Sequence, residues 1–404
     1  MENQAPWTLT ARWIIPVAGP PLPGGTITIL GERIASVDTH GARHADQDLG
    51  NAAILPGFVN SHTHLDLSGL RGRVSPTGCF TDWLRAVIHY RRTLSTEQVL
   101  ADIRDGLGEA LSYGTTLLGD IAAQGLSWSV LAQTCLRAVV FYELIGLPRA
   151  RALKAYIAAS HWLRGHPATE TCRPGLSPHA PYSVRRSLFR AAANLAQQQH
   201  TPLAIHLAET QAELEFLQTQ SGPFKDFLTE LGVWDKEGLI EGSEEVIDLN
   251  REAAQALFIH GNYLKPADVI SSGGTVVYCP RTHAFFGHGA HPFRELMAAG
   301  IRIALGTDSL ASSPDLDMLA EVRFLRRQFP EVPGSVLLRM ATLSGAEALG
   351  WHQETGSLAS GKSADLVVLP LPSEDRADPY SLILDSILPL KAVLTRGEWH
   401  GQLA

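Results

Sequence analysis

The stretch Ile54-Leu-Pro-Gly-Phe-Val-Asn-Ser-His-Thr-His64 is an apolar run that ends in two histidines. In a β-strand, residues two positions apart point to the same side, so His62 and His64 are expected to converge on one point. Two histidines at this spacing are a weak signal by themselves, because they also occur as ordinary surface or core residues. The polar residues that follow the other apolar runs decide between the two interpretations.

Seven further apolar runs of strand length follow, with segments of helical periodicity between them. This alternation indicates βαβ units and a parallel sheet. Eight such units over about 270 residues match the size of a (β/α)8 TIM barrel, an α/β fold. A doubly wound open sheet is the alternative, but no GxGxxG motif follows a predicted strand to support it. The expected strands are Ile54–His62, Gly114–Ile121, Ala138–Leu144, Gly175–His179, Pro202–Leu207, Ala256–His260, Thr275–Cys279 and Arg302–Thr307.

Both ends of the chain contain short apolar segments separated by turns. Residues 1–53 and 355–404 are therefore expected to form one small β-sandwich domain, and residues 54–354 the barrel. A chain of 404 residues is too long for one ordinary core but suits a barrel with a small appendage.

Composition argues against several classes of protein. Hydrophobic residues make up 45% of the chain and charged residues 18%, yet no window of 18 apolar residues predicts a membrane span. The four cysteines lack CxxC spacing and the first residues lack a secretory pattern, so a cytoplasmic protein is expected. The net charge is −8 and no long run of Lys and Arg occurs, so we expect no nucleic-acid partner.

Metal-ligating residue types stand at the ends of several expected strands. His179 ends the fourth strand, His206 and Glu209 lie at the end of the fifth, His260 ends the sixth, and Asp308 follows the eighth. Barrel enzymes place their active sites at the C-terminal ends of their strands. A single residue of this kind could be a polar strand cap, but their repetition at so many strand ends indicates a functional site.

Three imidazoles and one carboxylate make a nitrogen and oxygen donor set suited to Zn²⁺, with Fe²⁺ or Mn²⁺ as alternatives. A water bound to such a metal has its pKa lowered towards ~7, which supplies hydroxide at neutral pH. Glu209 is placed to exchange protons with this water and the substrate, and His260 to orient the hydroxide or polarise the tetrahedral intermediate. The predicted ligands of one divalent metal are His62, His64, His206 and Asp308.

Three motifs, Pro56–His64, His206-Leu-Ala-Glu209 and Gly306-Thr-Asp308, resemble those that define the amidohydrolase superfamily. Ser177-Pro-His-Ala-Pro-Tyr-Ser183 is similar to the strand-four motif of its adenosine-type deaminase branch, which includes aminodeoxyfutalosine, S-adenosylhomocysteine and methylthioadenosine deaminases. The resemblance covers nearly the whole chain. It implies a metal-dependent hydrolase of non-peptide carbon–nitrogen bonds in cyclic amidines, which deaminates an aminated purine nucleoside and releases ammonia. An aminodeoxyfutalosine substrate would place the enzyme in menaquinone biosynthesis.

Two departures from the resemblance bear on the substrate. In the S-adenosylhomocysteine enzymes, a Glu about two helical turns after a Trp-Leu pair binds the ribose hydroxyls. The matching stretch from Trp83 to Arg92 contains no acid, and Arg91 and Arg92 stand near that position. The strand-seven loop reads Cys279–Phe286, where those enzymes usually show an Asn-Pro-Ser-Ser-Asn-like stretch. An aminodeoxyfutalosine-type substrate or a smaller heterocycle is therefore the more attractive expectation.

In the leading hypothesis, Glu209 protonates the ring nitrogen, while Asp308 takes the hydroxide proton and passes it to the leaving amine. His179 is expected to hydrogen-bond the ring or amidine region of the small heterocyclic substrate, with a strand-capping role as the alternative. Arg149, with Arg151, is expected to meet a substrate carboxylate, and Trp83 to cover the site. Surface arginines and core packing are the alternatives for these residues.

Other hypotheses keep the site but change the reaction to guanine-type deamination, triazine dechlorination or cyclic amide hydrolysis. A metal-binding protein without turnover is remote, because Glu209 and Asp308 are both present. No lysine occurs from Ala155 to Pro223, so a carboxylated lysine cannot bridge two metals there, although Glu143 could take that place. A homodimer stays open, as do the exact substrate and the native metal. The sequence also leaves open the roles of Arg281, His283, His288 and His291.

Overall fold

The computed structural model describes residues 5–76, 78–251, 253, 255–374 and 378–400. Its largest sheet has eight strands in the spatial order β15-β14-β13-β12-β11-β10-β9-β8, and the pairings from β10 to β15 are parallel. A parallel bridge between Thr63 and Asp308 joins the two ends of this order. The predicted barrel is thereby confirmed. Its strands are β8 (Phe58–Thr63), β9 (Thr115–Ala122), β10 (Arg137–Leu144), β11 (Cys172–Pro178), β12 (Leu203–Leu207), β13 (Ala256–His260), β14 (Thr275–Tyr278) and β15 (Arg302–Leu305).

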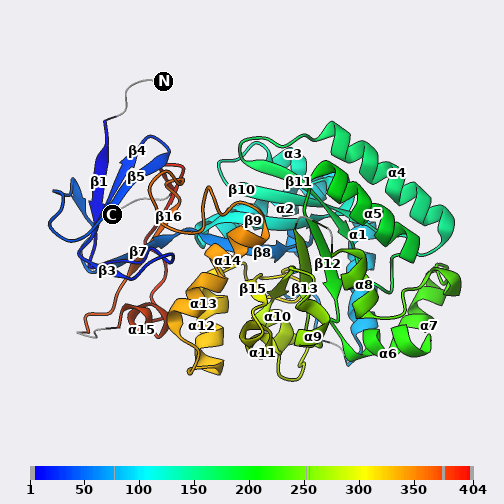
Figure 1. Cartoon of the computed structure of the whole chain (residues 1–404). Helices are drawn as coiled ribbons and strands as arrows, with labels where there is room; N and C mark the ends of the chain where they lie inside the picture. The colour runs from blue at the N-terminus through cyan, green and yellow to red at the C-terminus, as the bar shows by residue number, and fades with distance from the viewer. Residues whose placement is uncertain (1–4, 77, 252, 254, 375–377, 401–404) are drawn as a thin grey trace. The chain divides into compact units, whose positions relative to one another are not determined.

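Several of the helices that follow the barrel strands pack against the sheet. In α5, buried residues recur at helical spacing from Leu188 to Ala196, and this face packs on β11. Figure 1 shows α4 and α5 along the outside of β10 and β11. The helices are α1 (Phe80–Thr93), α2 (Thr96–Ser112), α3 (Trp128–Leu131), α4 (Arg149–Gly165), α5 (Arg186–Gln199), α6 (Gln211–Thr219), α7 (Pro223–Glu230), α8 (Ser243–Leu249), α9 (Pro266–Val269), α10 (Pro280–Phe285), α11 (Phe293–Ala298), α12 (Met318–Gln328), α13 (Gly334–Met340), α14 (Leu343–Ala348) and α15 (Pro379–Leu384).

Two small sheets contain strands from both ends of the chain, as expected for the predicted sandwich. One has the order β5-β4-β1-β6, and the other the order β18-β17-β16-β7-β2-β3. They share one core of buried apolar side chains that includes Ile27, Ile54 and Leu366. The strands are β1 (Trp7–Thr10), β2 (Trp13–Ile14), β3 (Leu22–Pro23), β4 (Thr26–Leu30), β5 (Arg33–Asp38), β6 (Gln47–Asp48), β7 (Ala52–Pro56), β16 (Leu366–Pro370), β17 (Ala392–Thr395) and β18 (Glu398–His400).

The expected strand Ile54–His62 is in fact two strands, which is a correction to the sequence analysis. Its first part belongs to β7, which pairs with β16 in the terminal sheet, and its second part is β8 of the barrel. Gly57 separates them at a point where a Cβ atom would collide with the side chain of Thr116. The apolar run is continuous across this point because both strands are buried, so hydrophobicity alone did not reveal the break.

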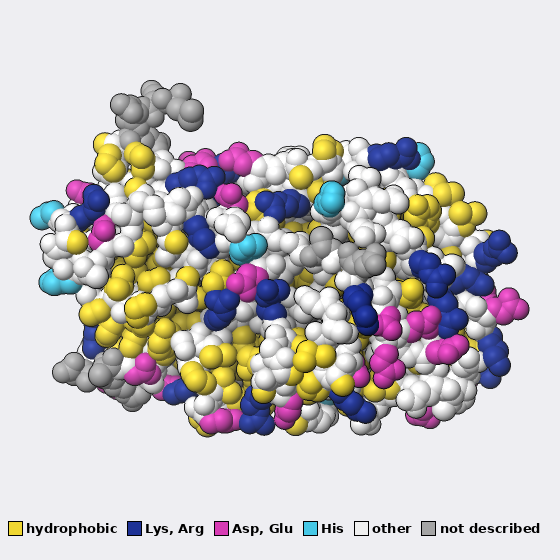
Figure 2. Space-filling view, in the orientation of Figure 1, with side chains coloured by type: hydrophobic (Ala, Val, Ile, Leu, Met, Phe, Trp, Pro, Cys, Tyr) yellow, Lys and Arg dark blue, Asp and Glu magenta, His cyan; other side chains and the backbone are white. Residues whose placement is uncertain are grey.

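The chain divides into two compact units, residues 1–60, 108–118 and 317–404, and residues 61–107 and 119–316. The predicted domain limits of 1–53 with 355–404 and of 54–354 stay a prediction, and residues 1–4 and 401–404 lie outside the described residues. Within the described ranges, no helix combines the length and the apolar character needed to cross a membrane. On the face shown in Figure 2, Lys and Arg side chains are intermixed with Asp and Glu.

Candidate active site

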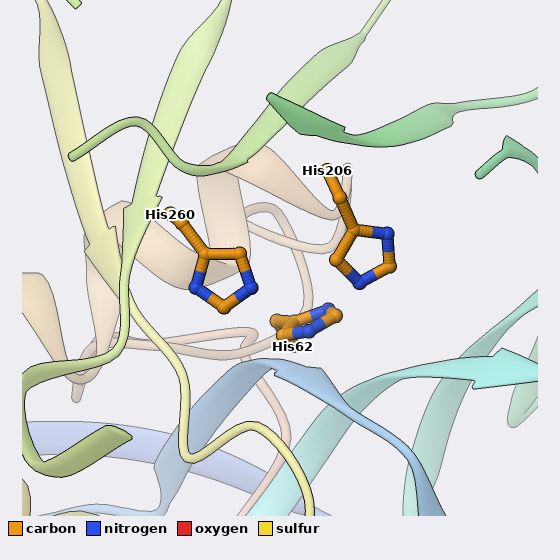
Figure 3. A group of neighbouring side chains, drawn as sticks. All are labelled: His62, His206 and His260. Atoms are coloured by element: carbon orange, nitrogen blue, oxygen red, sulfur yellow. The ribbon is translucent and has the colours of Figure 1, made fainter. Parts of the chain in front are cut away.

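Five side chains gather at the C-terminal ends of the barrel strands. One ring nitrogen from each of His62, His206 and His260 lies within 4.8 Å of the others. Figure 3 shows these three imidazoles turned towards one another. A second group with the same property consists of His62, His64 and a carboxylate oxygen of Asp308. We call these five residues the His/Asp cluster.

Short distances join the two groups into one cluster. Nε2 of His64 lies 3.2 Å from Nε2 of His206. Oδ1 of Asp308 lies 3.4 Å from Nε2 of His62 and 3.7 Å from Nε2 of His64. The structure therefore brings together all four residues that the sequence predicted as ligands, and His260 with them.

Two residues of the cluster have an unusual backbone conformation. His260 and Asp308 have φ angles of 66° and 58°, in the left-handed region that non-glycine residues rarely adopt. The Asp308 N–H donates to the carbonyl oxygen of His62 at 3.1 Å, and Thr63 Oγ1 donates to the Asp308 carbonyl at 3.0 Å. Gly306 permits this approach, because a Cβ atom there would lie 2.8 Å from the His62 carbonyl oxygen.

Neighbouring groups fix the orientation of the cluster. His206 Nδ1 lies 3.0 Å from the His179 carbonyl, which can only accept, so Nδ1 carries the proton and Nε2 faces the cluster with a lone pair. Metal-binding histidines commonly donate their second N–H in this way. The hydroxyl of Ser312 donates to Asp308 Oδ2 at 2.8 Å. Nε2 of His291 lies 2.8 Å from the His260 carbonyl.

Burial sets the protonation states that such a cluster needs. It lowers the pKa of His64 and His206, and it lowers the pKa of His260 to about 3, so these rings are neutral at pH 7. Burial acts to raise the pKa of Asp308, but a hydrogen bond and charge interactions with His62 outweigh it and hold the pKa below its ordinary value. Neutral imidazoles and an ionised carboxylate are the forms that bind metal, so the cluster fits a divalent cation.

Glu209 lies beside the cluster without belonging to either group of ligand atoms. Its Oε1 is 3.4 Å from Nε2 of His260. Burial raises the pKa of Glu209 well above the ordinary value, and the negative charges of Asp308 and Glu213 add to the effect. Two neighbouring carboxyl groups with pKa values pushed apart are a common basis for acid and base roles in one site.

A cavity of about 250 Å³ opens onto the cluster. Trp83 and Phe80 stack at 5.5 Å between ring centroids on one wall, and Trp83 Nε1 donates to the Ala311 carbonyl at 3.3 Å. Trp83 is thus both packed and cavity-lining, and its predicted role in covering the substrate stays a prediction. His179 also lines the cavity. Arg151 does so too, but Arg149 is exposed at the start of α4 and outside the lining, so its contact with a substrate stays a prediction. Apolar lining residues include Phe80, Leu84, Val87, Leu147, Phe227 and Leu231.

The amidohydrolase family model matches residues 53–394. The chain belongs to the amidohydrolase family. It is 28% identical over 363 residues to an aminodeoxyfutalosine deaminase of a Nitratiruptor species, with 87% of each chain covered. It is 30% identical over 378 residues to a 5-methylthioadenosine/S-adenosylhomocysteine deaminase of Moorella thermoacetica, covering 89% of this chain and 84% of that one. The resemblance and the expectation of a hydrolase are thereby confirmed.

The crystal structure of Helicobacter pylori aminofutalosine deaminase in complex with methylthio-coformycin has the same fold. The two structures superpose with a TM-score of 0.85 at 21% sequence identity, and the match covers 98% of this chain and 100% of the other. At this sequence identity the structural similarity establishes the fold alone. We therefore infer the chemistry of this amidohydrolase from its own residues.

Glu213 is a residue of this amidohydrolase that the sequence analysis did not single out. It is 1% exposed, and its carboxylate accepts from the backbone N–H groups of Ala208 and Glu209, each at 3.0 Å. Ala208 has a left-handed φ of 51°, so these bonds hold a strained turn directly before Glu209. The only sequence signal was its spacing of four residues from Glu209, which is one helical turn. Glu213 is therefore a positioning residue for Glu209.

We expect Glu213→Gln to destabilise the protein and to lower kcat. An amide has one acceptor oxygen, so one buried backbone N–H would face the amide NH₂ and stay unsatisfied, at a cost of about 1–3 kcal/mol. Urea unfolding measures the loss of stability, and steady-state kinetics measures kcat. Glu215→Gln, at an exposed position on the same helix α6, is the control and should match the wild type. Wild-type stability in Glu213→Gln would contradict the positioning role.

His288, His291 and Arg281 lie outside the cavity lining, whereas Glu143 is part of it. His291 is 3% exposed and supports the end of β13 through the His260 carbonyl. Nδ1 of His288 lies 3.1 Å from the hydroxyl of Tyr263. Arg281 pairs with Asp315 at 2.7 Å. Glu143, considered as a metal bridge, belongs to neither ligand group among the described residues.

Proposed function

We propose that this amidohydrolase is a hydrolytic deaminase of an aminated purine nucleoside, of the aminodeoxyfutalosine, S-adenosylhomocysteine or methylthioadenosine type. The observation that carries the proposal is the pair Glu209 and Asp308. These buried carboxyl groups have pKa values shifted in opposite directions, and they lie beside the imidazoles of His64, His206 and His260, whose pKa values burial lowers. Deamination of a cyclic amidine needs one group that protonates the ring nitrogen and one group that takes a proton from the attacking water. Deaminases of this kind are among the relatives of the chain.

We propose that His62, His64, His206 and Asp308 hold one divalent metal, with Zn²⁺ favoured and Fe²⁺ or Mn²⁺ as alternatives. A divalent metal in such a site lowers the pKa of a bound water towards ~7 and so makes a nucleophile available at neutral pH. His260 is neutral and lies against Glu209, so it can orient the attacking water and the oxygen that becomes the product carbonyl.

The side chains then divide the proton transfers. Water adds to the amidine carbon, and the ionised Asp308 accepts a proton from it. Glu209, whose pKa burial raises well above its ordinary value, protonates the adjacent ring nitrogen. The proton on Asp308 passes to the amino group, the hydroxyl proton of the adduct returns to Glu209, the carbon–nitrogen bond breaks, and ammonia leaves. The balance is one water consumed, one ammonia released and an adenine ring converted to a hypoxanthine ring.

The residues that line the cavity favour a substrate with an aromatic, acidic 5′ group. Apolar and aromatic side chains dominate the lining, which also contains Arg92 and Arg151. In the described part of the chain, neither arginine has an ion-pair partner. An aromatic ring can pack on the wall near Trp83 while its carboxylate meets an arginine, since guanidinium groups bind carboxylates strongly.

We expect adenosine carrying a carboxylated aromatic 5′ group to be a better substrate than adenosine itself. A hydrogen bond to a charged group contributes enough to raise kcat/KM by about 10–100-fold. The measurement is kcat/KM for a panel of 5′-substituted adenosines, with the carboxamide analogue of the same aromatic group as the control. Equal turnover for all 5′ groups would contradict the substrate assignment, and so would a preference for cytosine or guanine.

A further inference from the structure

Glu143 on β10 has one carboxylate oxygen bound and the other unsatisfied. Its side chain is 5% exposed and lines the cavity. Arg91 Nη1 donates to Glu143 Oε2 at 3.3 Å, and Arg91 Nη2 lies 2.9 Å from Oδ2 of the buried Asp66. Arg91 thus supplies the counter-charge that a buried carboxylate needs and fixes its orientation. Glu143 Oε1 is buried and has no hydrogen-bond partner among the residues that the structure describes.

His179 presents a second acceptor beside this oxygen. Its Nε2 lies 4.0 Å from Glu143 Oε1, too far for a hydrogen bond. The hydroxyl of Ser183 donates to the Ala180 carbonyl at 3.1 Å, so its oxygen accepts from His179 Nδ1 at 2.7 Å. With its proton on Nδ1, the neutral ring offers a lone pair at Nε2. Two hydrogen-bond acceptors, Glu143 Oε1 and His179 Nε2, therefore lie near each other, and neither can donate a hydrogen bond to the other.

We propose that Glu143 Oε1 and His179 Nε2 accept hydrogen bonds from the two hydroxyl groups of a vicinal diol, the ribose diol of the substrate. The inference rests on the proposed function, because it takes the substrate to be a nucleoside. It makes Glu143 a residue that determines specificity for the sugar.

The charges around the site favour neutral hydroxyl donors over an amine cation. Arg91 already neutralises Glu143, and Arg92 and Arg151 add positive charge to the same cavity. A diol brings two O–H donors on adjacent carbons, one for each acceptor. His179 also contacts the His/Asp cluster, with its ring centroid 4.9 Å from that of His206. A sugar bound by Glu143 and His179 would thus lie next to the point where the base reacts.

The test measures kcat/KM for each substrate with each form of the enzyme, so that the effect of removing a hydroxyl can be compared between wild type and variant. The substrates are an adenine ribonucleoside and its 2′-deoxy, 3′-deoxy and 2′,3′-dideoxy analogues, each assayed with wild type and Glu143→Gln. A site built to pair with hydroxyls rejects analogues that lack them. We expect wild-type kcat/KM to fall by at least about 10-fold for the dideoxy analogue. In Glu143→Gln, kcat/KM for the ribonucleoside should fall by about 10–100-fold, with little change for the dideoxy analogue.

A matched control and a binding measurement separate recognition from structure. Glu230→Gln breaks another arginine pair, Arg85 Nη2 to Glu230 Oε2 at 2.7 Å, outside the cavity lining, and should keep full discrimination. Competitive inhibition by inosine and by 2′,3′-dideoxyinosine should show the same hydroxyl dependence without turnover. Glu143→Gln should keep its metal, so that a change in kcat/KM is not a loss of the metal.

Equal losses for ribose and dideoxy substrates in Glu143→Gln would overturn the proposal, since they would mark a purely structural role. A wild type that deaminates both substrates equally well would overturn it while leaving the proposed function intact, and this comparison needs no variant. If no adenine nucleoside is deaminated at all, the proposed function fails and the diol site fails with it.

Discussion

Glu209→Gln is expected to lower kcat by at least about 10²–10⁴-fold, which is the usual contribution of a positioned acid or base. Glutamine keeps the shape of the side chain but cannot give up and regain a proton. Substrate should still bind, because the amide can make one hydrogen bond to the ring. Metal content should not change, because Glu209 lies outside both groups of ligand atoms. Steady-state kinetics and elemental analysis measure the two quantities on the same preparation.

Either of two outcomes would change the role given to Glu209. A variant that keeps more than about a tenth of kcat would move proton transfer elsewhere, with His260 at 3.4 Å as the next candidate. A variant that loses its metal would make Glu209 a ligand. Glu215→Gln, which is exposed on α6, controls for the substitution itself.

His64→Ala is expected to lose metal and activity together. The side chain of His64 is 10% exposed and lies 3.2 Å from His206 and 3.7 Å from Asp308, so no other residue can fill its place easily. Replacing even the hydrogen-bond partner of a metal ligand costs about 10–100-fold in affinity or activity, so removing the ligand itself should cost more. Elemental analysis should find one metal per wild-type chain and much less in the variant.

A control for this substitution is His283→Ala, because His283 is a partly buried histidine outside the His/Asp cluster. It should keep its metal. Two metals per chain in fully active wild type would contradict the single-metal assignment. Full metal occupancy and full rate in His64→Ala would remove His64 from the ligand set.

The barrel and the His/Asp cluster could be predicted because both depend on short-range patterns. Alternating strands and helices indicate the fold, and the end of each strand in a parallel barrel lies at one mouth. His62, His206 and Asp308 could therefore be placed together from their positions in separate strands. These residues converge in the structure because of the barrel topology, and the alternation of strands and helices in the sequence predicts that topology.

Features that depend on packing between elements could not be predicted. Glu213 acts through a strained backbone turn, and Arg91 joins Asp66 to Glu143, which are far apart in the sequence. At the start of α4, the phase of the helix decides that Arg151, and not Arg149, reaches the cavity. His291 is buried by contacts with β13 that no local pattern indicates.

The most direct test of metal-dependent nucleoside deamination is to measure ammonia and the adenine-to-hypoxanthine ultraviolet change together, with Zn²⁺-loaded protein. The proposed mechanism predicts one ammonia for each adenine nucleoside converted, with activity lost in a chelator and restored by Zn²⁺. The absence of ammonia from every adenine nucleoside of the panel, or an undiminished rate after metal removal, would contradict it.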